Sequence, residues 1–284
     1  MSPEKSTYLK LAETLTAEFQ CIPCVQAVAL GGSQTGGGTL DQHSDIDLYI
    51  YTNDTVPLSA RQAIVDKLGA SRADLNLTFW DLGDEWYDLD TGIEVDIIYW
   101  DQNWITEQID RVVINHQASM GYTTCFWRTI LNSNVLYDPH GWFVILQQKC
   151  DRPFPEALKR AIIAKNHPVL RGVIPSYRGQ IKKALDRGDA ISVNHRMATF
   201  FASYFDVLFA LNEVLNPGEK KLMPFTLANC PKLPSDFQPQ VETVLQLAAS
   251  SDEELLIALD RLMGNLDELL RQEGFDPGKT RTLE

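Results

Sequence analysis

The stretch that decides the fold is Ala29-Leu30-Gly31-Gly32-Ser33, followed after eleven residues by Asp45-Ile46-Asp47-Leu48-Tyr49-Ile50. The apolar run over residues 25–30 ends in two glycines, the pattern of a short buried strand. The second part alternates polar and apolar residues with the period of two that is typical of a half-buried strand. We therefore predict two strands joined by a glycine-rich loop.

The alternation also sorts the side chains of the second strand. Asp45 and Asp47 fall on one face, and the three aliphatic residues among them fall on the opposite, buried face. Two adjacent carboxylates repel each other unless a cation lies between them, and Mg²⁺ is bound by one or two carboxylates together with substrate phosphates. Glycines let the backbone approach a phosphate closely, and the Ser33 hydroxyl and nearby N–H groups are suited to bond its oxygens.

A third carboxylate would complete a two-metal site, and a neighbouring strand should supply it. Residues 93–100 alternate again and carry Asp96 among apolar residues, with Glu94 on the same face. A buried aspartate without a partner would cost several kcal/mol, so we expect Asp96 to have one. A metal ion is the favoured partner.

The acidic charge of the chain is confined to its first half. The 284 residues include 25 Lys and Arg against 38 Asp and Glu, a net charge of −13. Residues 1–140 hold 7 against 20, whereas residues 141–284 hold 18 against 18. This balance argues against a protein that coats nucleic acid or anionic lipid. Residues 149–187 nevertheless carry 10 basic and 3 acidic residues, so a phosphate or RNA contact there stays open.

Composition and pattern together predict two domains. Hydrophobic residues make up 44 % and charged residues 22 % of the chain, which excludes collagen-like, fibrous and disordered proteins. At roughly 150 residues per domain, the length fits two domains. The first half interleaves strands with helices, which predicts a mixed sheet covered by helices, and the second half predicts a helical bundle. We expect strands at 25–30, 45–51, 74–80 and 93–100, and helices at 9–19, 58–68, 105–114, 155–165, 179–187, 197–211 and 255–269, the last with a Ser251/Glu254 capping box.

These motifs resemble the nucleotidyltransferase superfamily of the polymerase-β-like fold. In that pattern a strand leads into Gly-Gly-Ser, the next strand opens with two acidic residues around an apolar one, and a later strand supplies a third acid. Residues 25–100 match it most specifically. The first half most resembles the branch of lincosamide and aminoglycoside nucleotidyltransferases and their uncharacterised relatives. Those proteins carry a helical domain after the catalytic one, as this chain is predicted to do. The resemblance implies an α+β fold with a catalytic nucleotidyltransferase domain over residues 1–140 and a helical substrate-binding domain over residues 141–284.

The resemblance also implies an activity and its residues. It implies an enzyme that uses Mg²⁺, two ions in all, to transfer a nucleoside monophosphate, AMP from ATP or another nucleotide, to a hydroxyl of a small molecule such as an antibiotic, releasing pyrophosphate. It assigns metal binding and catalysis to three carboxylates: Asp45, Asp47 and Asp96. The nucleotide phosphates would be held by Gly31, Gly32, Ser33, Lys220 and Lys221. The general base would be Asp96 or, as a second choice, Glu94.

Two other functions stay open at this stage. A toxin-like or regulatory nucleotidyltransferase acting on tRNA or a protein would suit the basic stretch. A non-catalytic nucleotide-binding module would tolerate a degenerate site, which the intact carboxylate set argues against. No stretch approaches the ~20 apolar residues of a membrane span. Without a secretory signal, and with five scattered cysteines, we expect a cytoplasmic protein with reduced thiols and no membrane partner, and a homodimer is left open.

Two further clusters have an ordinary interpretation beside a functional one. A run of acidic residues before the third-carboxylate strand predicts a surface loop, or else a wall of the acceptor site that attracts a cationic substrate. Its members are Asp81, Asp84, Glu85, Asp88 and Asp90. The Cys21/Cys24 pair has zinc or redox spacing, but no second pair of ligands lies near it, so ordinary thiols are favoured.

Overall fold

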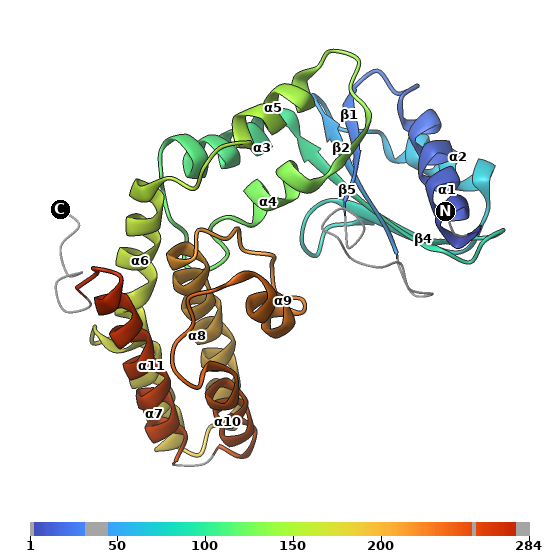
Figure 1. Ribbon diagram of the computed structural model, residues 1–284. Helices are drawn as coiled ribbons and strands as arrows, with labels where there is room; N and C mark the ends of the chain where they lie inside the picture. The colour runs from blue at the N-terminus through green and yellow to red at the C-terminus, as the bar shows by residue number, and fades with distance from the viewer. Residues whose placement is uncertain (1–2, 32–44, 252–253, 277–284) are drawn as a thin grey trace. The chain divides into compact units, whose positions relative to one another are not determined.

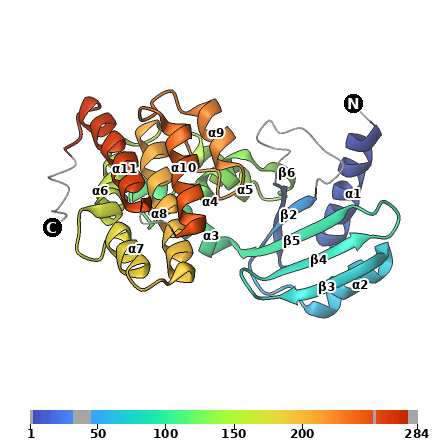
Figure 2. The ribbon, with the colours of Figure 1, turned by 90° about the horizontal axis from the view of Figure 1, so that it is seen from below.

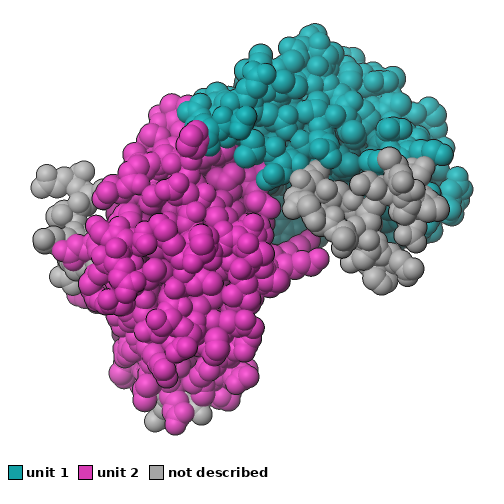
Figure 3. Space-filling view, viewed as in Figure 1, with its two compact units in different colours: residues 1–110, 129–152 teal, residues 111–128, 153–284 magenta. Residues whose placement is uncertain are grey.

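The computed structural model describes residues 3–31, 45–251 and 254–276. A mixed sheet with helices packed on it comes first along the chain, and a helical region follows (Figure 1). This confirms the α+β fold class predicted from the sequence. The chain divides into two units, residues 1–110 with 129–152 and residues 111–128 with 153–284 (Figure 3). Helix α5 (Trp142–Cys150) therefore belongs with the first unit, although it follows residue 140 in the sequence.

The sheet of the first unit has six strands in the described residues, in the order β3-β4-β5-β2-β1-β6. Strands β2 and β5 run parallel, and the other neighbouring pairs are antiparallel. The strands are β1 (Val25–Leu30), β2 (Ile46–Thr52), β3 (Ala70–Leu77), β4 (Gly83–Asp88), β5 (Glu94–Asp101) and β6 (Asn134–Tyr137). Strands β1 and β2 coincide closely with the two strands predicted around the glycine-rich loop.

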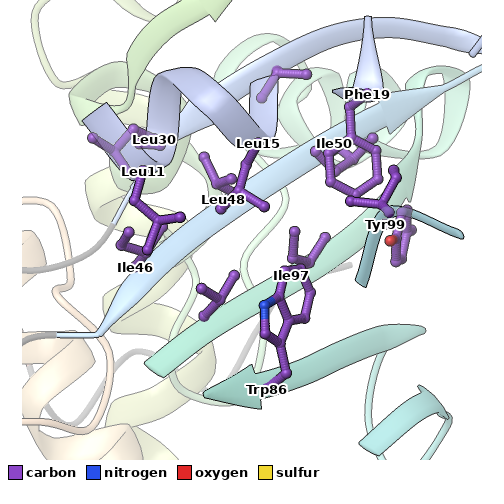
Figure 4. Packing of buried hydrophobic residues seen from close by; sticks show 14 of the residues in the cluster. Leu11, Leu15, Phe19, Leu30, Ile46, Leu48, Ile50, Trp86, Ile97 and Tyr99 are labelled. Atoms are coloured by element: carbon purple, nitrogen blue, oxygen red, sulfur yellow. The ribbon is translucent and has the colours of Figure 1, made fainter. Parts of the chain in front are cut away.

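One face of the sheet carries the core of the first unit. Leu15 and Phe19 of α1 (Pro3–Phe19) pack over Leu48 and Ile50 of β2, and Ile97 of β5 joins them (Figure 4). These three strand residues are fully buried, as the alternation of the sequence predicts. Burying an aliphatic side chain contributes about 1.5–3 kcal/mol to stability. The buried face therefore fixes the register of β2, and the odd-numbered residues of this strand lie on the opposite face of the sheet.

The other helices of the first unit begin where the sequence offers a cap or a break. Helix α2 (Leu58–Leu68) follows Pro57 and ends at Gly69. Helix α3 (Gln102–Ile109) begins earlier than predicted, because the Asp101 carboxylate accepts hydrogen bonds from the N–H groups of Asn103 and Trp104 at 2.9 Å each. It continues as the π-helical turn η2 (Asp110–Ile114), and α4 (Cys125–Asn132) follows.

The second unit is built around one long apolar helix. Helix α8 (Ala190–Leu211) packs against α6, α7 and α10 (Figure 2), and its residues Phe200, Tyr204 and Leu208 are fully buried. The remaining helices are α6 (Glu156–Arg171), α7 (Tyr177–Leu185), α9 (Leu222–Asn229), α10 (Phe237–Ser250) and α11 (Leu255–Gln272). In the described parts of the chain, no helix combines the length and the hydropathy that crossing a membrane requires.

The capping box predicted for the last helix is wrong. Ser251 ends α10 in the left-handed region, with φ of 51°, and the N-cap position of α11 belongs to Glu254. The capping signature needs its serine in extended backbone directly before the first turn. Here Ser251 is the C-cap residue of the preceding helix instead. The spacing of residues in the sequence does not distinguish a serine that ends one helix from a serine that begins the next.

The acidic segment before β5 also differs from its prediction. It forms strand β4 and its flanking turns, so the predicted surface loop is wrong. Asp84 and Asp88 are only 1 % and 4 % exposed. Asp84 accepts hydrogen bonds from Arg61 and from the Tyr99 hydroxyl, both at 2.7 Å, and Asp88 accepts from the Thr91 hydroxyl at 2.6 Å. These carboxylates are buried because they have partners, and the two side chains that donate to Asp84, Arg61 and Tyr99, lie 15 or more residues away.

A buried ionic cluster connects α6 and α11 in the second unit. The Asp267 carboxylate lies 2.6 Å from Nε2 of His167 and accepts a hydrogen bond from Arg171. Desolvation by burial raises the pKa of Asp267, but the hydrogen bonds and charges of His167 and Arg171 outweigh it and lower the pKa below its usual value. Since the carboxylate is more acidic in the folded chain, its contribution to stability is present above the unfolded pKa and is lost as the pH falls through the folded one.

We therefore expect Asp267→Asn to flatten the acid limb of the stability profile. Between about pH 5 and about pH 3, the wild type should lose more of its free energy of unfolding than the variant does, because only the wild type must protonate a carboxylate of lowered pKa. Urea unfolding across this range measures it. Asp236→Asn is the matched control, because the Asp236 side chain is 68 % exposed. Equal slopes for wild type and Asp267→Asn would contradict the assignment.

Candidate active site

Strands β2 and β5 bring two of the predicted carboxylates together. Asp47 and Asp96 are direct Cα partners in the parallel ladder, and both side chains are half-buried. Both point to the face opposite the core, since Leu48 and Ile97, the next residues along each strand, are buried in it. Neighbouring strands lie about 4.8 Å apart, so the two carboxylates start from adjacent positions. This is the neighbouring-strand arrangement that the sequence predicts for a third carboxylate.

Asp45 directly precedes β2 and is held in place by the first helix. Its backbone carbonyl accepts a hydrogen bond from the Tyr8 hydroxyl of α1 at 3.0 Å. Burial raises the pKa of Tyr8, and the negative charges of Asp47 and Asp45 raise it further. Tyr8 therefore stays a hydrogen-bond donor over the whole physiological pH range and anchors the start of the carboxylate strand.

Tyr49 lies next to all three carboxylates. Its ring stacks on Trp100 of β5, with centroids 4.7 Å apart and planes inclined by 8°. Burial raises the pKa of Tyr49, and the charges of Asp47, Asp96 and Asp45 raise it further, in that order. One ring is thus within electrostatic range of all three predicted carboxylates, and the facing positions of Asp47 and Asp96 come from the strand register.

Gly31, the first glycine of the sequence motif, lies directly beside Asp47. The backbone N–H of Gly31 donates to the Asp47 carbonyl at 2.9 Å, so the two halves of the sequence motif meet at this hydrogen bond. A Cβ atom on Gly31 would lie 2.2 Å from Cε2 of Tyr49. The structure therefore requires glycine at position 31 because of Tyr49. Gly32 and Ser33 lie outside the described residues, and their phosphate contacts stay predictions.

Replacing Gly31 by alanine is expected to lower the free energy of unfolding by about 1–3 kcal/mol, because the new methyl group overlaps the Tyr49 ring. In a Tyr49→Ala background the same replacement should cost much less, and urea unfolding of the four proteins measures the difference. Gly264→Ala is the control, since a Cβ atom there meets nothing within 4 Å. An equal cost of Gly31→Ala in both backgrounds would rule out Tyr49 as the cause.

The sequence names Glu85 only as a member of the acidic run, and the structure places it on this face. Glu85 of β4 is the Cα partner of Asp96, so Asp47, Asp96 and Glu85 follow one another across three strands. Glu85 is exposed. Glu94, the second choice for a general base, is the Cα partner of Tyr87. A hydrogen bond with Glu94 is the largest cause that raises the pKa of Tyr87. The alternation over β4 could have revealed Glu85, but the acidic run concealed the strand.

Lys220 and Lys221 lie in the second unit, in the turn before α9. Both are exposed, and Lys221 occupies the N-cap position with φ of 54°. The predicted contact between these lysines and a nucleotide bound on β2 stays a prediction.

The donor chemistry of the site fits Mg²⁺ bound together with a substrate. Within residues 3–31, 45–251 and 254–276, no group of three or more His, Cys, Asp or Glu side chains is arranged to hold a metal ion by itself. Asp47 and Asp96 supply two hard oxygen donors from adjacent positions, and Mg²⁺ usually takes one or two carboxylates and completes its shell with phosphates and water. Cys21 and Cys24 are free thiols, as are Cys125, Cys150 and Cys230.

No family model matches the sequence, and no curated protein matches it. Among solved structures, the chain is similar to the crystal structure of a nucleotidyltransferase-like protein from Exiguobacterium sibiricum. The two share 15 % sequence identity with a TM-score of 0.37, over 93 % of this chain and 74 % of that chain. The function is therefore argued from the residues of the chain itself.

Proposed function

We propose that the protein is an Mg²⁺-dependent nucleotidyltransferase. It transfers a nucleoside monophosphate, AMP from ATP in the first instance, to a hydroxyl group of a small-molecule acceptor. The observation that carries the proposal is the in-register pair of Asp47 and Asp96 on parallel neighbouring strands. Gly31, which opens the Gly-Gly-Ser turn, is hydrogen-bonded to the backbone of the same Asp47. A phosphate-binding turn beside a carboxylate pair on neighbouring central strands is what metal-assisted phosphoryl chemistry needs.

The chain would contribute to the reaction mainly by positioning. Asp47 and Asp96 would hold Mg²⁺ together with the nucleotide phosphates, and the ion supplies charge neutralisation there when it is bound. Asp45 is the further ligand that the sequence resemblance implies. The Gly-Gly-Ser turn would hold the β- and γ-phosphates, leaving the α-phosphorus in front of the acceptor. A bond then forms between the acceptor oxygen and the α-phosphorus while the bond to pyrophosphate breaks. The proton of the acceptor hydroxyl goes to a carboxylate, for which Asp96 is the first choice.

The acceptor is proposed at the level of a class. An antibiotic of the lincosamide or aminoglycoside type is the class that the sequence resemblance implies. The exposed Glu85 beside Asp96 adds negative charge to the same face and so favours an acceptor that carries positive charge.

Ion pairs within the chain weaken the argument for a tRNA acceptor, which rests on the basic residues of the stretch 149–187. Six of the 10 basic residues in the stretch 149–187 form ion pairs, which reduces the free positive charge offered to a polyanion. The pairs are Lys149–Asp110, Lys159–Glu156, Arg160–Glu156, Arg171–Asp267, Arg178–Asp260 and Lys182–Asp186. A small-molecule acceptor is therefore the better supported proposal.

Label transfer tests the proposal directly. The full-length protein is incubated with each α-labelled nucleoside triphosphate, Mg²⁺ and separate panels of aminoglycosides, lincosamides, tRNA and cell lysate. We expect label on a small molecule, with pyrophosphate released, and none when a chelator replaces Mg²⁺. Transfer to tRNA that falls steeply with salt would establish the alternative instead. No transfer to any acceptor, together with no detectable nucleotide binding, would sink the enzymatic proposal.

A further inference from the structure

Strand β3 forms an open edge of the sheet. In the described residues it pairs with β4 alone (Figure 2), and residues 71–74 are exposed. The charged residues of the strand are Arg72 and Asp74, and it contains no proline and no lysine. Its register against β4 shifts between Ala70 and Arg72 and again between Asp74 and Leu77, which leaves a regular segment centred on Ala73.

The charges of this segment are complementary to themselves. Arg72 and Asp74 flank Ala73 and form an ion pair within the chain, with Nη2 and Oδ2 2.7 Å apart and side chains 73 % and 50 % exposed. If two copies of the strand met in antiparallel orientation around Ala73, Arg72 of each copy would lie opposite the partner's Asp74. Opposite charges in directly facing positions stabilise an antiparallel pair, whereas like charges destabilise it. The small Ala73 side chain would let the two backbones approach at the centre.

Exposed apolar groups lie at both ends of the same edge. Phe79 and Trp80, just beyond the end of β3, are 79 % and 90 % exposed and contact each other edge to face. Leu89, which is 61 % exposed, packs on Gly69, just before the start of β3. Antiparallel pairing around Ala73 places the end of one strand beside the start of the other. The aromatic pair of each copy would then approach the partner's Leu89.

We propose that the edge of β3 is a homodimer interface, in which two copies of the chain pair their β3 strands in antiparallel orientation around Ala73 and form one continuous sheet. The occupant of the edge is a second copy because the charges and apolar ends of the strand complement themselves under a twofold axis. A partner of unrelated sequence would not account for both. This inference does not depend on the proposed enzymatic activity.

Charge exchange tests the interface. Sedimentation velocity of the wild type over a concentration series should give a species of twice the 32.0 kDa chain mass. Arg72→Asp and Asp74→Arg each place like charges opposite each other twice, so each should weaken the dimer by about tenfold or more. The double variant Arg72→Asp/Asp74→Arg should dimerise like the wild type. An equal mixture of the two single variants should form a heterodimer, because every facing pair is then again of opposite charge.

A second change separates the apolar ends from the charges. Phe79→Ser/Trp80→Ser removes exposed rings without altering charge, and it should also weaken the dimer. Circular dichroism confirms that each variant is folded, and all the replaced side chains are exposed ones. A wild type that stays monomeric at every concentration would overturn the proposal. So would single charge variants that dimerise as tightly as the wild type, or a mixture of them that fails to associate.

Discussion

Replacing Asp47 by alanine is expected to lower the rate of nucleotidyl transfer by about a thousandfold or more, which corresponds to about 4 kcal/mol of transition-state stabilisation. Asp47 and Asp96 face each other across two strands, so each would contribute an oxygen to the same metal site. Removing either one leaves the phosphates without part of the charge that neutralises them. Asp96→Asn should therefore cause a loss of the same order.

The stability of these variants distinguishes a lost ligand from a lost fold. Asp96→Asn keeps the size of the side chain, and urea unfolding without metal measures whether the variant keeps the free energy of unfolding of the wild type. With Mg²⁺ and a nucleotide, the wild type should gain stability and Asp96→Asn should not, which a thermal-shift titration measures. Asp90→Asn, at an exposed turn position, is the matched control and should behave like the wild type. Label transfer that survives in Asp45→Ala/Asp47→Ala would refute the site.

The sequence was sufficient where a pattern is local. An apolar run that ends in glycines placed β1, and alternation placed β2 and β5. Alternation also turned Asp47 and Asp96 away from the core, because a period of two is a property of the strand itself. It could also indicate that Asp96 belongs to a neighbouring strand. It could not supply the register, which depends on the pairing of β2 with β5 across nearly fifty residues of chain.

The sequence was insufficient where the partner of a residue is distant. Gly31 looked like a phosphate-binding glycine, yet the ring of Tyr49 already excludes any side chain there. Strand β4 was missed because a run of acidic residues is typical of surface loops. Asp84 is buried in this strand only because Arg61 and Tyr99 come from other elements of the fold. With β4 missed, the position of Glu85 directly beside Asp96 could not be predicted, although Glu85 had been named in the acidic run.

Replacing Asp84 by alanine is expected to lower the free energy of unfolding by about 3–5 kcal/mol. One carboxylate oxygen accepts hydrogen bonds from Nη1 of Arg61 and from the Asn76 N–H, both at 2.7 Å, and the other accepts from the Tyr99 hydroxyl at 2.7 Å. Arg61 and Asp84 are 3 % and 1 % exposed. Without the carboxylate, the guanidinium of Arg61 would stay buried with its charge uncompensated. Urea unfolding measures the loss, and Glu85→Ala, the exposed neighbour, should stay within about 0.5 kcal/mol of the wild type.

A double variant decides whether the cost comes from the charge that is left behind. Arg61→Met/Asp84→Leu replaces both partners by apolar side chains, and such replacements of buried pairs are often close to neutral. We therefore expect the double variant to be more stable than Asp84→Ala, although it changes more atoms. Because Asp84 lies on β4, whose next residue Glu85 pairs with Asp96 of β5, Asp84→Ala should also weaken nucleotide binding at Asp96, and the double variant should recover part of it. A double variant less stable than Asp84→Ala would mean that packing, and not the unpaired guanidinium, sets the cost.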